Sequence, residues 1–140
     1  MGPRALSAVT EIPGPARALA AVYAVFALAA GARSVVQLAT HASRAPLAYV
    51  LSALAAAVYL VATVALRRPG RSSRRVAWAA CSLELAGVLL VGTLSLVAAD
   101  AFPDETVWSR YGQGYGHLPL VLPLLGLGWL WHAGRRERGR

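Results

Sequence analysis

Long apolar stretches separated by short polar connections dominate this chain of 140 residues. Four such stretches are expected to be helical spans, over residues of about 18–38, 47–66, 76–99 and 116–133. A helix needs about 20 apolar residues to cross the hydrocarbon core of a bilayer. The first three stretches reach that length, and the fourth needs its flanking residues. The pattern therefore predicts an all-α polytopic membrane protein, built as an antiparallel four-helix transmembrane bundle.

The short connections predict a single transmembrane domain over residues 16–133, because they force consecutive helices to be antiparallel neighbours. Residues 1–15 contain three prolines and are expected to be a flexible cytoplasmic lead, and residues 134–140 a basic cytoplasmic tail. Small residues at 27–32 also fit a signal-peptidase site. The segment before the first span is long and contains Glu11, so an uncleaved first helix is favoured.

Composition agrees with a membrane protein, since 57% of the residues are hydrophobic and only 14% are charged. All 14 basic residues are arginine, and the abundance of alanine, glycine, valine and leucine indicates a G+C-rich, bacterial genome. A net charge of +8 would suggest nucleic acid in a soluble protein, but these arginines flank the predicted spans, so no nucleic-acid partner is expected. Cys81 is the only cysteine, which excludes an internal disulfide.

The distribution of arginine predicts the orientation. Five arginines and no acid lie within residues 67–75, between the second and third spans. The positive-inside rule places this connection in the cytoplasm, and both termini then lie on the same side. Three of the six acids, Asp100, Asp104 and Glu105, fall in the opposite, external connection. We expect a multi-pass protein of the bacterial plasma membrane with both termini cytoplasmic.

Polar side chains recur along the predicted spans at helical spacing, so each span carries a polar stripe. Its charged members are Arg33 and Glu84, and an ionised side chain inside a span costs at least about 2.5 kcal/mol. At 1.5 Å per residue, Glu84 lies roughly 12 Å and Arg33 roughly 22 Å from the cytoplasmic edge, with Tyr59 near the level of Glu84. We therefore predict a Glu84–Tyr59 hydrogen bond in preference to a Glu84–Arg33 salt bridge. The candidate intramembrane polar site comprises Arg33, Gln37, Tyr59 and Glu84.

Two interpretations of this site stay open. In the first, the stripes are packing seams and Glu84 is a neutral donor that bridges helices, because burial disfavours the charged carboxylate. In the second, Glu84 carries protons. Arg33 either lines an outward polar vestibule with Gln37 and His41, or extends to the outer membrane interface.

The external connection of residues 100–117 has a pattern of its own. A proline and two acids at 103–105 form a helix-start signal, and Trp108 and Tyr111 then share one face. This predicts a short helix on the outer membrane surface, followed by a glycine-rich run and a fourth span that bends near Pro123. The candidate external interaction loop comprises Trp108, Tyr111 and Tyr115.

No catalytic constellation is visible. His41 and His117 lack a third ligand, so no metal site is expected. The sequence also has no glycine-rich phosphate loop and no nucleophile elbow. We expect neither a cofactor nor an enzymatic activity.

Residues 106–115 and their continuation into 118–123, Thr-Val-Trp-Ser-Arg-Tyr-Gly-Gln-Gly-Tyr and Leu-Pro-Leu-Val-Leu-Pro, resemble the uncharacterised small four-helix integral membrane proteins of actinobacteria. The resemblance covers the last third of the chain specifically and implies a membrane protein without an assigned site. Small multidrug transporters also have four spans and a membrane glutamate, but theirs lies in the first span and Glu84 lies in the third.

Two functions are therefore expected in order. The leading one is a non-enzymatic accessory or interaction subunit that uses the external loop to contact lipid, a membrane-protein partner or a second copy of the chain. The alternative is a small oligomeric proton-linked transporter that uses Glu84 and Arg33.

Overall fold

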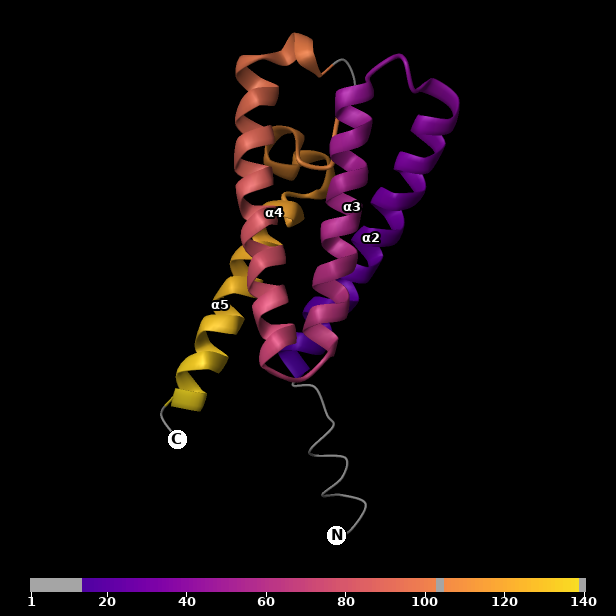
Figure 1. The fold of residues 1–140 in the computed structure, drawn as a ribbon. Coiled ribbons are helices and arrows are strands. Elements are labelled where there is room, and N and C mark those ends of the chain that lie inside the picture. The colour runs from indigo at the N-terminus through magenta and orange to yellow at the C-terminus, as the bar shows by residue number, and fades with distance from the viewer. Residues whose placement is uncertain (1–13, 103–104, 139–140) are drawn as a thin grey trace.

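The computed structural model describes residues 14–102 and 105–138. Within these ranges the chain is helical and has no strand, which confirms the all-α prediction. The elements, in chain order, are α2 (Gly14–His41), α3 (Pro46–Arg67), α4 (Arg71–Val97), the 3₁₀ segments η1 (Ala99–Ala101) and η2 (Ser109–Tyr115), and α5 (Leu118–Arg138) (Figure 1).

Three helices, α2, α3 and α4, are long and apolar enough to cross a membrane. The predicted spans 18–38 and 47–66 lie inside α2 and α3. Helix α4 begins at Arg71 instead of residue 76 and ends at Val97, so most of the arginine-rich connection is helical. Residues 1–13 of the predicted lead lie outside the described residues, and Gly14 and Pro15 already belong to α2.

The fourth span differs from the prediction. Helix α5 has 21 residues and ends in four charged residues, and it is not among the described helices that meet the length and hydropathy of a span. Gly126 of α5 lies against Cys81 of α4. Counting 1.5 Å per residue from that contact puts Leu118 about 12 Å short of the level where α4 ends. Helix α5 therefore begins part-way along the bundle, as Figure 1 shows, and a four-helix transmembrane bundle is not confirmed.

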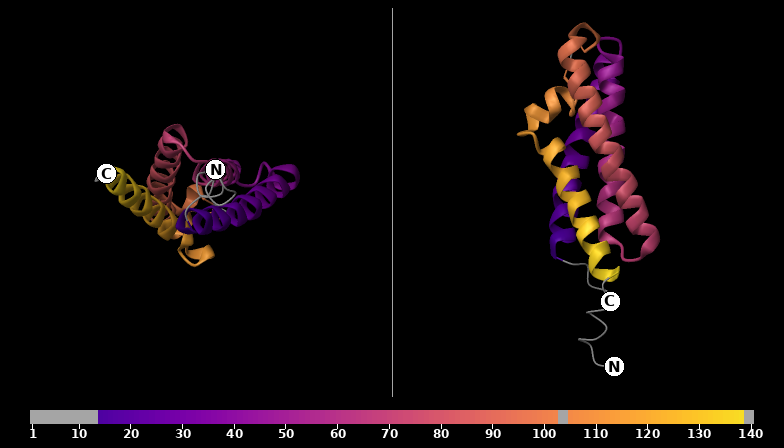
Figure 2. Two further views of the ribbon diagram at one scale, coloured as in Figure 1. Left: turned by 90° about the horizontal axis from the view of Figure 1, so that it is seen from below. Right: turned by 90° about the vertical axis from the view of Figure 1, so that its left-hand side faces the viewer.

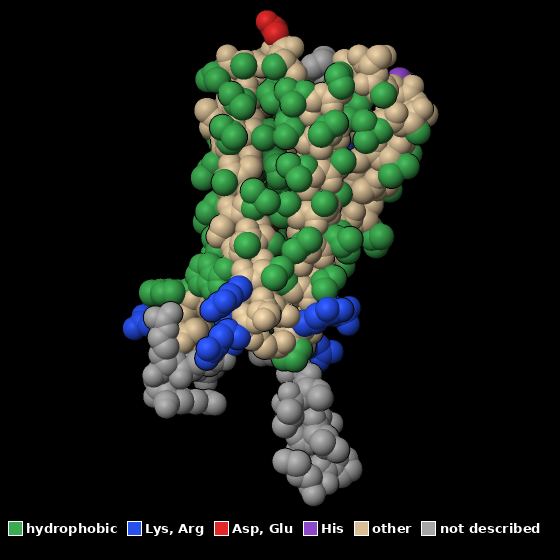
Figure 3. All heavy atoms as spheres, in the orientation of Figure 1, with side chains coloured by type: hydrophobic (Ala, Val, Ile, Leu, Met, Phe, Trp, Pro, Cys, Tyr) green, Lys and Arg blue, Asp and Glu red, His purple; other side chains and the backbone are tan. Residues whose placement is uncertain are grey.

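The helices pack side by side in an antiparallel arrangement (Figures 1 and 2). Helix α3 packs most extensively on α2 and also contacts α4, which in turn supports α5. Fully buried alanines let α2 and α3 approach closely, as small residues do between membrane helices. Among them are Ala20, Ala30, Ala55 and Ala62. The start of α2, the α3–α4 connection and the end of α5 lie together at what we call the arginine end (Figure 3).

After α4 the chain turns back between the helices. The predicted surface helix is wrong for the described residues, although Pro103 and Asp104 of its start signal lie outside them. Residues 105–117, here named the re-entrant segment, form turns and the 3₁₀ element η2. Arg110 and Tyr111 have φ angles of 51° and 59°, a left-handed conformation that costs about 1–3 kcal/mol each outside glycine. Such a turn bends the chain in a way that no α-helix does.

Candidate intramembrane polar site

Helices α2, α3 and α4 each direct a fully enclosed polar side chain to the middle of the bundle. Tyr23, Tyr59 and Glu84 are all 0% exposed. The hydroxyl of Tyr23 donates a hydrogen bond to Oε2 of Glu84 at 2.6 Å. It also lies 3.7 Å from Sγ of Cys81, which is one turn before Glu84 on the same face of α4. The carboxyl group is thus held from two helices.

The re-entrant segment completes this site from the side opposite the arginine end. Trp108 is 2% exposed, and its indole Nε1 donates to the hydroxyl of Tyr59 at 2.9 Å. Its ring lies against Gly87, where a Cβ atom would come within 2.6 Å of a ring carbon. Only a residue without a side chain leaves room for the indole there. We call Tyr23, Tyr59, Cys81, Glu84 and Trp108 the central polar cluster.

Hydrogen bonding in the central polar cluster is incomplete. Oε1 of Glu84 is buried and has no partner among the described residues. The hydroxyl of Tyr59 accepts from Trp108, and no acceptor for its own proton is found in the same part of the chain. An unmatched buried acceptor and a spare donor in one enclosed cluster are uncommon in folded proteins and call for a functional explanation.

Aromatic rings surround the cluster on the sides of α2 and α3. The ring centroid of Tyr59 lies 5.9 Å from that of Tyr23 and 6.0 Å from that of Phe26. Phe26 in turn lies 5.7 Å from Tyr115 of the re-entrant segment. The side chains that face Glu84 are therefore tyrosines, a thiol and aromatic rings, and no charged side chain opposes it within the described residues.

Three further contacts hold the re-entrant segment against the helices. Arg33 of α2 donates to the hydroxyl of Tyr115 at 3.0 Å. Thr93 of α4 pairs with the hydroxyl of Tyr111 at 2.9 Å, and the Tyr111 ring lies where a side chain on Gly92 would be. The backbone N–H of Arg110 donates to Ser95 Oγ at 2.9 Å. Side chains from two helices thus fix the left-handed turn.

The structure brings together only part of the predicted site. Tyr59 and Glu84 lie in one cluster, but the partner of Glu84 is Tyr23, so the predicted Glu84–Tyr59 bond is wrong. Trp108 occupies Tyr59 instead. Arg33 is exposed and bonds to Tyr115, with no bond to Glu84.

Gln37 also lies apart from the cluster, half-buried on α2, with Oε1 unpaired among the described residues. Nearby on the same helix, Ser34 Oγ is buried and unpaired in that same part of the chain. Together with Arg33 these residues line the half of α2 that leads away from the arginine end. The vestibule interpretation stays a prediction.

The three aromatic residues expected to face a partner turn toward the helices instead. Trp108 is buried, and Tyr111 and Tyr115 are half-buried. Gly87 and Gly92 were the available signals, because each lies on α4 at a height where a ring fits against the backbone. Tyr23 was visible as a member of the first polar stripe, but spacing along one helix does not reveal which residue of another helix it meets.

The described residues contain no group of three or more histidine, cysteine, aspartate or glutamate side chains that could hold a metal ion. The chemistry open to the central polar cluster is exchange of a proton at one carboxyl group, with Tyr23 as its fixed partner.

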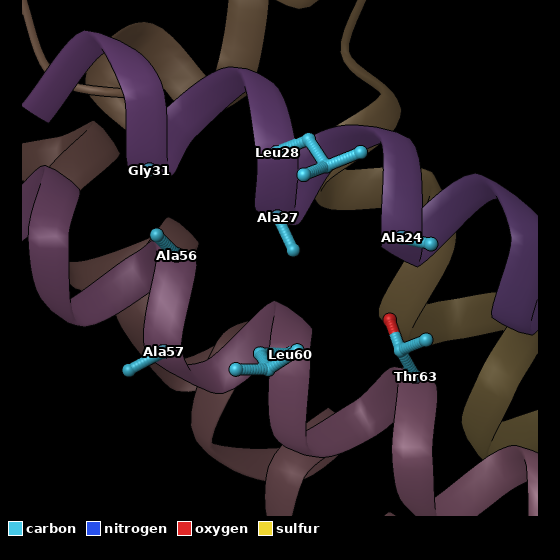
Figure 4. Close-up of a pocket in the computed structure, with 8 residues that line it drawn as sticks. All are labelled: Ala24, Ala27, Leu28, Gly31, Ala56, Ala57, Leu60 and Thr63. Atoms are coloured by element: carbon cyan, nitrogen blue, oxygen red, sulfur yellow. The ribbon is translucent and has the colours of Figure 1, made fainter.

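A second feature lies on the outer face between α2 and α3. It is an apolar groove of about 470 Å³, in which Thr63 is the only polar side chain. Figure 4 shows its lining, which is Ala24, Ala27, Leu28 and Gly31 of α2 and Ala56, Ala57, Leu60 and Thr63 of α3.

No family model, curated protein or solved structure matches this chain.

Proposed function

We propose that this protein is a small oligomeric proton-linked transporter of the bacterial plasma membrane, with four passes and both termini cytoplasmic. In this proposal Glu84 binds and releases the proton, and the re-entrant segment is the outer gate. The observation that carries it is Trp108, which comes from the far end of the bundle and covers a buried carboxyl group that keeps one oxygen unpaired.

The backbone of the re-entrant segment supports this role. Irregular backbone at membrane depth is tolerated only where protein buries it or where it lines an aqueous cavity. Gly87, against which Trp108 packs, lies ten residues before the end of α4, or about 15 Å along its axis. An ionisable side chain next to such a segment is a functional-site hypothesis by default.

The contacts of the segment are few enough to break. Opening it requires loss of the side-chain bonds made by Trp108, Tyr111 and Tyr115. At about 0.6–2 kcal/mol each, these bonds keep the closed state dominant by a few kcal/mol, which leaves a minor open population. Gly112 and Gly116, with φ angles of 82° and 64°, are suited to act as hinges.

The proton balance of one opening is simple. When the segment moves outward, the Glu84 carboxylate takes a proton from the outer solution while Tyr23 stays bonded to Oε2. Closure then isolates the neutral acid, and release on the other side restores the carboxylate. Arg33 positions the gate through Tyr115 and does not take part in proton transfer.

Proton flux into vesicles tests the proposal. The purified protein is reconstituted with a trapped pH-sensitive dye, and a pH gradient is imposed. We expect Glu84→Gln to lower the flux at least tenfold, and Glu105→Gln, which alters an exposed acid of the re-entrant segment, to leave it unchanged. Equal flux in wild type and Glu84→Gln, or flux no greater than in protein-free vesicles, would refute it.

The accessory role is a second candidate because the α2–α3 groove is open toward the lipid and lined by small residues that suit a partner helix. Extraction from the native membrane followed by intact-assembly mass spectrometry tests it. A stoichiometric partner that is lost in Ala27→Leu and Ala56→Leu but kept in Val25→Leu, which alters an exposed site outside the groove, would favour this candidate.

A further inference from the structure

Exposed arginines gather at one end of the molecule (Figure 3). They come from the beginning of α2, the α3–α4 connection and the last turns of α5, which are far apart in sequence. We call this group the arginine rim, and it comprises Arg17, Arg67, Arg68, Arg71, Arg75 and Arg135.

The chain supplies almost no negative charge to balance the rim. Residues 14–83 and 118–135 contain no aspartate or glutamate. Asp100 and Glu105 are exposed beyond the other end of α4. Arg71 and Arg75 are one turn apart on α4, an arrangement of like charges that disfavours a helix. They also stand on the positive end of that helix, whose first turn has no acid.

The depth of the rim relative to the apolar surface is marked by Trp131 and Arg135. The guanidinium carbon of Arg135 lies 5.0 Å from the centroid of a Trp131 ring, and Trp131 is 56% exposed. Exposed tryptophans are enriched at the level of lipid headgroups. On α4, the exposed apolar Val76 follows Arg75 directly, so the charged and apolar surfaces meet at this level.

We propose that the arginine rim binds the headgroups of anionic phospholipids. Guanidinium groups form paired hydrogen bonds with phosphate oxygens, and a cluster of exposed guanidinium groups at headgroup depth offers several such contacts at once. This inference requires that the protein be in a bilayer, but it does not depend on the transport proposed for Glu84.

Intact-assembly mass spectrometry and thermal unfolding in vesicles test the inference. The protein is reconstituted in phosphatidylcholine with or without phosphatidylglycerol. The rim variant combines Arg67→Gln, Arg68→Gln, Arg71→Gln and Arg75→Gln, and the control variant combines Arg33→Gln and Arg110→Gln, exposed arginines outside the rim. A third sample contains phosphatidylcholine with added inorganic phosphate.

We expect phosphatidylglycerol to be retained by the wild type and to raise its melting temperature, with both effects weakened by 1 M salt. Each arginine removed is expected to weaken retention roughly fivefold, so the rim variant should lose at least about tenfold and the control much less. Should the rim variant fail to fold, the salt and lipid dependence of the wild type decides.

Three results would overturn the inference: equal stability of the wild type in both lipids, equal lipid retention by the rim and control variants, or the same stabilisation by inorganic phosphate. Retention of nucleic acid or of an acidic protein in place of lipid would also overturn it. Proton flux measured in the same vesicles separates this outcome from that of the proposed transport.

Discussion

Substitution of Gly87 by alanine tests whether Trp108 is seated against α4. The new Cβ would lie 2.6, 2.7 and 3.0 Å from three carbons of the indole ring, so the ring has to move. Moving it breaks the 2.9 Å hydrogen bond to Tyr59. Overpacking costs about 1–3 kcal/mol and the lost bond about 0.6–2, while alanine regains up to about 1 kcal/mol of helix propensity. The net expectation is a loss of about 1–4 kcal/mol.

Gly128→Ala is the matched control, because Gly128 is in α5, is exposed and has nothing within 4 Å of the new Cβ. It should gain up to about 1 kcal/mol from helix propensity alone. Reversible unfolding in mixed micelles, followed by circular dichroism, measures both variants. The rate at which a maleimide labels buried Cys81 gives a second readout, since a looser re-entrant segment exposes the thiol more often.

A double-mutant cycle makes the test specific. Trp108→Ala alone should cost about 3–5 kcal/mol. In the Gly87→Ala background the clash is already absent, so the combined cost should fall at least about 1 kcal/mol below the sum of the single costs. The seating of Trp108 is refuted if the two costs add, or if Gly87→Ala and Gly128→Ala change the free energy of unfolding equally.

Two other substitutions examine the central polar cluster by the same unfolding assay. Tyr23→Phe removes the one hydrogen bond that Glu84 makes within the described residues and should cost about 1–3 kcal/mol; an unchanged stability would mean that this bond is absent. Gly126→Ala places a Cβ 2.8 Å from the sulfur of Cys81 and should destabilise, and Cys81→Ala in the same chain should reverse part of that loss; failure of the second change to help would contradict the close approach of α5 to α4.

The first three helices were predictable because hydropathy over 20 residues is a property of the local sequence. The predicted spans 18–38 and 47–66 fall inside α2 and α3, and Glu84 was recognised from its place within a span. The partner of Glu84 was not predictable. Counting along a helix gives its height in the bundle, but the rotation of α2 relative to α4 decides whether Tyr23 or Tyr59 meets the carboxyl group.

The re-entrant segment was mispredicted for a different physical reason. Trp108 and Tyr111 have helical spacing, so local pattern favours an amphipathic helix. The seats of their rings are Gly87 and Gly92, far away in the sequence, and those contacts outweigh the local preference. Part of the fourth crossing is consequently made by irregular backbone, and this explains why the apolar stretch that begins α5 seemed too short.

One face of α4 specifies the position of every other element of the bundle. Glu84 receives the hydrogen bond of α2, Cys81 contacts α5, and Gly87 and Gly92 accommodate the re-entrant segment. Because water is not available inside a bilayer to satisfy the polar groups of this face, the chain itself must provide their partners.

Trp108 is the point at which this requirement links the two parts of the site. Its indole N–H satisfies Tyr59, which lies in the same enclosed cluster as Glu84, so outward movement of the re-entrant segment removes that donor. The protonation of Glu84 and the position of the segment are thus energetically coupled. By linkage, a ligand or proton that favours one state of the carboxyl group shifts the segment, and anything that moves the segment changes proton binding by the same factor.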